Sequence, residues 1–223
     1  MAVTFQEAKR EQLSLLAPVE KRTLIWLAEH APRWVNSDHL TLLGFVALLG
    51  AGLSYWWARW NPVGLYAVIV CLALNWLGDS LDGTLARVRN RQRPRYGFYV
   101  DHVVDAFGAL FLLVGLALSG FMSERIALVL LIAYLMLSIE VYLATYALGT
   151  FHLSFWKLGP TELRILLVIG NIVLLLKPTA GLAGTGWRLF DIGGVAGIAG
   201  MTLMLIVAAV RHTRALYDAE RLR

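Results

Sequence analysis

Charged residues and cysteine are scarce in this chain. Only 16% of its 223 residues are Asp, Glu, Lys or Arg, whereas 58% are hydrophobic, and the mean hydropathy is +0.64. Soluble domains carry about 25% charged residues, so the composition excludes that class and favours a polytopic membrane protein. The lone Cys71 excludes an intrachain disulfide and a thiolate metal site. The N-terminus lacks the pattern of a cleavable signal peptide, so we expect the first span to direct membrane insertion.

Long apolar stretches give the fold class. A transmembrane helix needs about 20 apolar residues, and six stretches meet that need, at residues 40–58, 62–82, 99–120, 125–148, 161–176 and 190–210. The sequence therefore predicts an all-α integral membrane protein with six transmembrane helices. We detect no internal repeat or linker, so residues 39–223 are expected to form one catalytic domain after an N-terminal segment, residues 1–38.

An amphipathic helix is predicted in the N-terminal segment, over residues 19–31 between two prolines. Apolar and charged residues lie on opposite sides of this helix: Leu24, Ile25, Leu27 and Ala28 against Glu20, Lys21, Arg22 and Glu29. Trp26 and Trp34 suit the head-group level of a bilayer. We expect an interfacial anchoring helix, with a role in gating substrate as the alternative.

Basic residues are distributed unevenly along the chain. Five Lys and Arg precede the first span, five lie in the second loop, two in the fourth and four in the tail, against four in all the other loops. Because basic loops stay on the cytoplasmic side, both termini and the second loop are expected to face the cytoplasm of a cell (inner) membrane. The net charge of +5 then reflects membrane orientation, and we expect no nucleic-acid partner.

Four carboxylates lie where a membrane protein should avoid them. Asp79 and Asp82 end the second span, and Asp101 and Asp105 begin the third. Helical geometry separates the members of each pair by about 60° and 40°, so each pair projects from one face. Because the two spans run antiparallel, all four should meet at one depth, where their repulsion must be neutralised. Oxygen ligands without His or Cys favour Mg²⁺ or Mn²⁺, and this number of carboxylates can hold two ions.

The residues between the two pairs suit a phosphate group. Gly83, Ala86 and Gly97 lack bulk, and Arg87 supplies a fixed cation. The full pattern, Asp79-x-x-Asp82-Gly83-x-x-Ala86-Arg87, nine residues, Gly97-x-x-x-Asp101-x-x-x-Asp105, closely resembles the signature of the CDP-alcohol phosphotransferase family at all eight fixed positions. Six spans after an amphipathic helix, with the motif joining the second and third, also resemble that family.

The resemblance implies a metal-dependent transferase of phospholipid synthesis that moves a substituted phosphate from a CDP-linked alcohol to an acceptor hydroxyl and releases CMP. It implies that Asp105 is the general base and that one substrate is a lipid. The implied metal ligands are Asp79, Asp82, Asp101 and Asp105, and the implied contacts of the CDP moiety are Asp79, Gly83, Ala86, Arg87 and Gly97.

Donor and acceptor remain open. CDP-diacylglycerol could donate to a polar alcohol, in which case a cytoplasmic pocket for an anionic acceptor could include Lys157, Arg164, Arg211 and Arg214. A soluble CDP-aminoalcohol could instead donate to diacylglycerol, because the stretch 159–164 and the pair Asp101-His102 faintly resemble the choline and ethanolamine branch. Glu140 and Glu162 are candidates for a site or for helix packing and helix-terminus stabilisation.

Two further alternatives complete the predictions. A Mg²⁺ channel or transporter could also use intramembrane carboxylates, but the outer halves of the spans carry no second polar ring to continue a path. In the last span, the small residues Gly193, Gly194, Gly197 and Gly200 allow close helix approach. We expect them to pack within the bundle, with a homodimer contact as the alternative.

Overall fold

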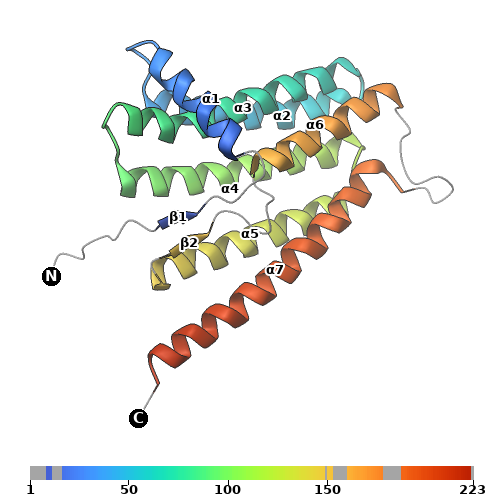
Figure 1. The fold of residues 1–223 in the computed structure, drawn as a ribbon. Coiled ribbons are helices and arrows are strands. Elements are labelled where there is room, and N and C mark those ends of the chain that lie inside the picture. The colour runs from blue at the N-terminus through green and yellow to red at the C-terminus, as the bar shows by residue number, and fades with distance from the viewer. Residues whose placement is uncertain (1–8, 12–16, 149, 153–159, 178–186, 222–223) are drawn as a thin grey trace.

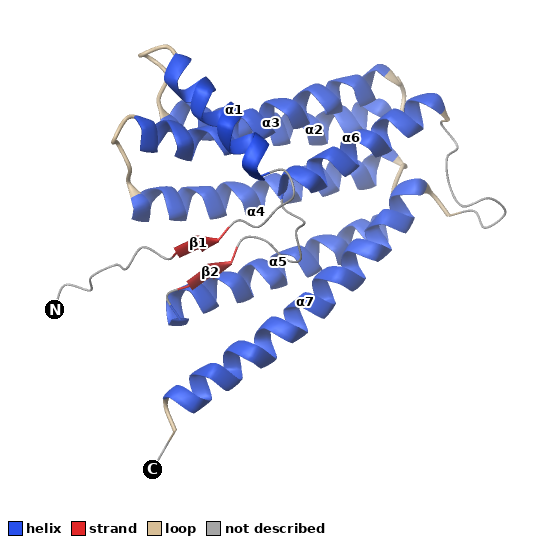
Figure 2. Ribbon diagram, in the orientation of Figure 1, coloured by secondary structure: helices blue, strands red, loops and turns tan. Residues whose placement is uncertain are grey.

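The computed structural model describes residues 9–11, 17–148, 150–152, 160–177 and 187–221. The helices in this part of the chain are α1 (Ala17–His30), α2 (Ser37–Ala58), α3 (Val63–Val88), α4 (Pro94–Ser119), α5 (Glu124–Leu148), α6 (Pro160–Leu176) and α7 (Leu189–Ala219). Two three-residue strands, β1 (Lys9–Glu11) and β2 (Thr150–His152), pair in parallel (Figure 2). The predicted helical class is confirmed, and this short strand pair was not predicted.

Five of the described helices, α2, α3, α4, α5 and α7, are long and apolar enough to cross a membrane. Many of their Leu, Ile and Val side chains point outward, as expected of surfaces that contact lipid. The helix α6 coincides with the predicted fifth span but has 17 residues, and at about 1.5 Å per residue it is slightly shorter than the hydrocarbon core. The membrane class is therefore supported, and the count of six spans, with α6 as the fifth, stays a prediction.

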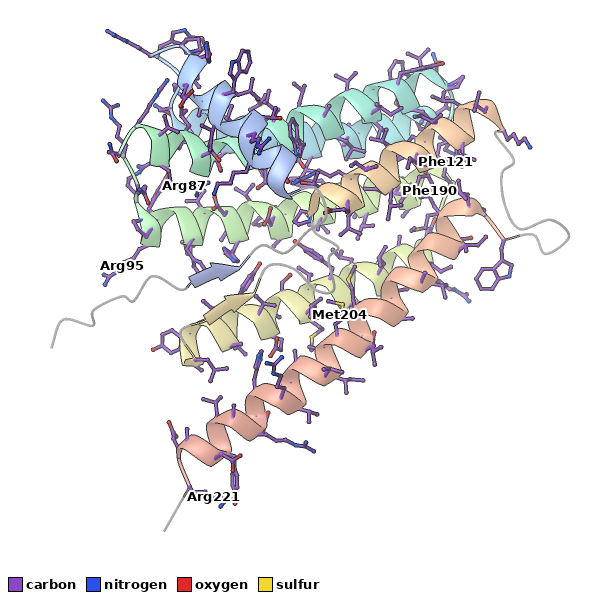
Figure 3. The ribbon with its side chains drawn as sticks, viewed as in Figure 1. Arg87, Arg95, Phe121, Phe190, Met204 and Arg221 are labelled. Atoms are coloured by element: carbon purple, nitrogen blue, oxygen red, sulfur yellow. The ribbon has the colours of Figure 1, made fainter. Side chains whose placement is uncertain are left out.

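Successive transmembrane helices run in opposite directions along the bundle (Figure 1). The helix α2 packs against α3 and α4, α5 packs against α4 and α7, and α6 packs against α3. Basic residues of the α3–α4 turn, such as Arg87 and Arg95, lie at one end of the bundle, and Phe121 and Phe190 lie at the other (Figure 3). An apolar core that includes Tyr55 and Phe190 occupies this second end.

Glycines decide how closely the first transmembrane helices approach. A Cβ on Gly78 of α3 would lie 2.5 Å from the carbonyl oxygen of Leu40 and 2.6 Å from the nitrogen of Gly44, both on α2. At the other end, a Cβ on Gly115 of α4 would lie 2.1 Å from the oxygen of Gly52. These contacts leave no space for a side chain, so the backbones of α2, α3 and α4 touch directly.

The predicted N-terminal helix is present as α1, which lies across α3 (Figure 1). Leu24 and Ala28 are buried against Leu40 and Leu85, as the apolar side of the pattern suggests. Glu20 was assigned to the polar side, and this was wrong: it is only 8% exposed. Three donors from α3 and α6 surround its carboxylate, which explains how a charge is accepted there. The position of α1 at the membrane surface stays a prediction.

The glycines of α7 divide into two groups. A Cβ on Gly194 would meet Ile126 at 2.6 Å, and one on Gly197 would meet Leu130 at 3.1 Å, both residues of α5. The predicted packing within the bundle is confirmed for these two positions. A Cβ on Gly193 or Gly200 would meet no atom within 4 Å, so these two glycines are not used in the described contacts. The homodimer stays a prediction.

Candidate active site

The carboxylate motif straddles a tight turn between two long helices. The helix α3 continues to Val88 and α4 starts at Pro94, so both extend several residues beyond the predicted spans. Asn90 adopts the left-handed conformation, with φ of 52°, that reverses the chain. Proline at the first position of α4 fits its fixed φ. The eight motif positions therefore all lie on helices, which fixes their relative directions.

Two arginines of this turn hold neighbouring segments. The guanidinium of Arg89 donates to the backbone oxygens of Ala31, Pro32 and Val35, which precede α2. Arg93 forms an ion pair with Asp38 in the first turn of α2. These basic residues thus join the α3–α4 turn to the segment before α2, in addition to any part in membrane orientation.

All four motif carboxylates line one cavity, at the end of the bundle that carries the turn. Its volume is about 10 Å³, close to the smallest space that holds one water molecule. It admits an ion or a water but is too small for a nucleotide. Its lining consists of Thr41, Gly44, Asn75, Asp79, Asp82, Asp101, Val104 and Asp105. The structure therefore brings together the four residues that the sequence predicted to converge.

Asp82 is the most enclosed of these carboxylates, at 8% exposure. Its Oδ2 accepts a hydrogen bond of 2.7 Å from the Thr41 hydroxyl, and its Oδ1 accepts one from the nitrogen of Gly83. The hydroxyl of Ser37 donates to the Asp82 backbone oxygen at 3.0 Å. The first turn of α2 thus orients Asp82, and the glycine contact at Gly78 allows α2 to come close enough.

Asp79 has a cationic partner from a distant helix. The Nη2 of Arg164 on α6 lies 2.5 Å from Asp79 Oδ2, and its Nε donates to Asn75 Oδ1 at 2.7 Å. Asn75 in turn donates to the Gly44 oxygen at 3.0 Å. One chain of polar contacts therefore joins α2, α3 and α6 beside the cavity, and Arg164 compensates part of the negative charge there.

Asp101 and Asp105 reach the same cavity from α4, and both are partly buried. His102, which lies between them in sequence, turns toward α5 instead. Its Nδ1 contacts the Phe98 oxygen at 2.5 Å, and its ring lies 4.4 Å from that of Tyr142. The two aspartates and the histidine thus serve different faces of α4, as a helical spacing of one residue requires.

Apart from Asp79, the residues assigned to the CDP moiety are not part of the cavity lining. The guanidinium of Arg87 passes over Gly83, where an added Cβ would lie 3.5 Å from Nη1, and its Nη2 donates to Thr84 at 3.0 Å. An added Cβ on Gly97 would meet nothing within 4 Å. Gly97 therefore faces open space, as a binding surface for a larger group requires.

The chemistry of the cavity suits a hard cation, although the side chains are not arranged around one. Among the described residues, no three His, Cys, Asp or Glu side chains are grouped closely enough to hold a metal ion. Arg164 and Thr41 instead engage Asp79 and Asp82. The donors that line the cavity include four carboxylates and one hydroxyl and lack His and Cys, which is the set that Mg²⁺ and Mn²⁺ prefer.

Comparison with known families identifies the chain. The family model of CDP-alcohol phosphatidyltransferase matches residues 34–212. The chain belongs to this family. No curated protein matches its sequence.

Membership of the CDP-alcohol phosphatidyltransferase family gives the reaction class. The family consists of membrane transferases of phospholipid synthesis that transfer a phosphate group from a CDP-alcohol. The matched region contains every motif residue discussed above.

The sequence missed two polar residues of the cavity lining and placed differently an arginine that contacts it. Thr41 and Asn75 carry no motif signal, and Arg164 was assigned to an acceptor pocket. Arg211 and Arg214, assigned to the same pocket, are exposed on α7, and Lys157 lies outside the described residues. The one available sequence signal concerned Asn75, a polar residue within an apolar span that lies about one helical turn before Asp79.

The other candidate residues of the CDP-alcohol phosphatidyltransferase chain have structural partners. Glu140 on α5 lies 2.6 Å from Nδ1 of His212 on α7, a contact that fits helix packing, one of its two predicted roles. Glu162 lies in the first turn of α6 and is buried. Neither residue lines the cavity.

Proposed function

We propose that this chain transfers a substituted phosphate group from a CDP-linked alcohol to an acceptor hydroxyl, with release of CMP, in a metal-dependent reaction at the cavity between α3 and α4. The observation that carries the proposal is that Asp79, Asp82, Asp101 and Asp105 line one cavity. The family match supports the reaction class.

The four aspartates hold one or two divalent cations, Mg²⁺ or Mn²⁺. When bound, such a cation stabilises the charge that develops on the transferred phosphate. Arg164 and Thr41 engage only the Oδ2 atoms of Asp79 and Asp82, so both carboxylates would keep lone pairs for a cation while these contacts orient them. The buried position of Asp82 favours cation binding, because an uncompensated carboxylate there is costly.

The remaining motif residues bind the donor and activate the acceptor. Asp105 removes the proton of the acceptor hydroxyl, whose oxygen then forms a bond to the β-phosphorus of the donor. The bond from that phosphorus to the oxygen of the departing CMP breaks. Arg87 binds the diphosphate beside Gly83 and Ala86, where no bulky side chain intervenes. The open space at Gly97 receives part of the CDP moiety.

The active site and both chain termini face the cytoplasm of the inner membrane. The four aspartates lie in the second half of α3 and the first half of α4, so the cavity lies in the half of the bundle that carries the α3–α4 turn, and such basic turns stay on the cytoplasmic side. A water-soluble substrate and CMP exchange with the cytoplasm, and the lipid substrate arrives between helices from the bilayer.

The direct test is a panel of CDP-linked donors and alcohol acceptors offered to the purified protein in detergent, with CMP release as the measurement. CDP-diacylglycerol with polar alcohols, and CDP-aminoalcohols with diacylglycerol, separate the two substrate branches. Release that requires both an acceptor and Mg²⁺ or Mn²⁺ is expected. A protein that is monodisperse and folded but releases no CMP with any pair contradicts the proposal.

A further inference from the structure

A second polar cluster lies next to the cavity and joins α1, α3 and α6. The carboxylate of Glu20 in α1 accepts three hydrogen bonds at one oxygen, Oε1. The donors are the indole nitrogen of Trp76 at 2.8 Å, the hydroxyl of Ser80 at 3.2 Å and the hydroxyl of Thr161 at 2.8 Å. Trp76 and Ser80 belong to α3, and Thr161 belongs to α6. One carboxylate oxygen from α1 therefore connects two helices.

The cluster adjoins the ion pair of the cavity on both helices. Ser80 directly follows Asp79, and Thr161 lies three residues before Arg164, on the same side of α6. The contact between α3 and α6 thus includes two polar layers, formed by residues adjacent in sequence on α3 and three residues apart on α6. In the first, Arg164 donates to Asn75 and Asp79. In the second, donors of both helices converge on Glu20.

The second layer needs an acceptor that α3 and α6 do not provide there. Trp76, Ser80 and Thr161 all supply donors to it, and a buried donor without an acceptor is costly. Glu20 is itself 8% exposed, and its Oε2 is buried without a hydrogen-bond partner among the described residues. A membrane protein keeps such a carboxylate only at a compensated site.

We propose that Glu20 is a positioning residue of the reaction: through Thr161, it holds the start of α6 against α3 and so keeps Arg164 at Asp79. The helix α1 then completes the active site as well as anchoring the chain. This inference rests on the proposed function for its kinetic test, and its structural test is independent of turnover.

The first test compares Glu20→Met with Glu20→Gln. Methionine has a similar length but no strong acceptor, whereas the glutamine carbonyl still accepts from the three donors. We expect E20M to lower kcat by roughly ten- to a hundredfold, as the displacement of a positioned group does, with the KM for the CDP-linked donor little changed. E20Q should stay close to the wild-type rate. Thr161→Val and Thr161→Ser form a second pair, because valine removes the hydroxyl and serine retains it.

A double-mutant cycle separates positioning from general stability. If Glu20 acts through Arg164, E20M should add little to the loss already caused by Arg164→Ala. Independent, additive losses would overturn the proposal, as would E20M and T161V enzymes that turn over at the wild-type rate.

The structural readout is the distance distribution between spin labels at Leu163 of α6 and Val46 of α2, measured by pulsed electron paramagnetic resonance in a Cys71→Ala background. Both side chains are exposed, and Cys71 is the one cysteine of the chain. We expect a broader distribution in E20M and T161V than in wild type, E20Q and T161S. An unchanged distribution in E20M and T161V would overturn the proposal even if no donor supports CMP release, whereas broadening without turnover would contradict only the proposed function.

Discussion

Replacement of Gly78 by alanine tests whether the α2–α3 contact sets the active-site geometry. The added Cβ would lie 2.5 Å from the Leu40 oxygen and 2.6 Å from the Gly44 nitrogen. Both are backbone atoms of α2, so no side-chain rotation relieves the overlap. To reach an ordinary separation of about 3.5 Å, the helices must part by roughly 1 Å at this point.

That displacement is large on the scale of the site. The hydrogen bond from Thr41 to Asp82 is 2.7 Å long, and an extra 1 Å or so would take it out of range. Overpacking of this kind costs about 1–3 kcal/mol of stability. A misplacement of about 1 Å near reacting groups costs up to 100-fold in rate. We therefore expect G78A to lower both the melting temperature and kcat.

The assay pairs CMP release with thermal unfolding in the same detergent, using two control variants. Gly200→Ala adds a methyl group where no atom lies within 4 Å, so its rate and melting temperature should equal those of the wild type. Gly52→Ala places a Cβ 2.2 Å from the Phe111 oxygen, but about 12 Å along α2 from Gly44. It should lower the melting temperature while kcat falls less than in G78A.

A G78A protein with wild-type rate and melting temperature would show that the α2–α3 contact does not set the geometry of the active site. A loss of kcat in G52A that equals the loss in G78A would show that the rate follows stability alone, and would remove the claim that this contact acts on Asp82.

Other predictions concern the carboxylates and the topology. Replacement of any one of Asp79, Asp82 or Asp101 by Asn should abolish CMP release, because the amide keeps the shape of the carboxylate but loses its charge. Unchanged release in all three variants would contradict their role as metal ligands. A chelator should silence the wild type and Mg²⁺ or Mn²⁺ should restore it; persistent activity in chelator would argue against a metal. Asp105→Asn should reduce kcat far more than donor affinity, since a base acts in the chemical step. In a Cys71→Ala background, an impermeant thiol reagent on intact cells should label a cysteine at Glu124 but not one at Gln92, and the reverse would overturn the cytoplasmic site.

The sequence by itself determined the membrane class, the convergence of the four carboxylates and, among its six predicted spans, the five helices that are long and apolar enough to cross a membrane. These features depend on local rules. An apolar run of sufficient length indicates a span, and residues three or four apart share a helix face. Antiparallel succession of two helices then brings Asp79 and Asp82 to the same depth as Asp101 and Asp105, without knowledge of any other contact.

Only the tertiary structure decided which groups neutralise that charge. Arg164 reaches Asp79 across 85 residues of sequence, and Thr41 reaches Asp82 across 41. Contacts between residues distant in sequence also explain the error at Glu20. Helical periodicity placed it on the polar face of α1, whereas three donors from α3 and α6 bury it. Periodicity shows which residues share a face, but which helix covers that face depends on the packing of the whole bundle.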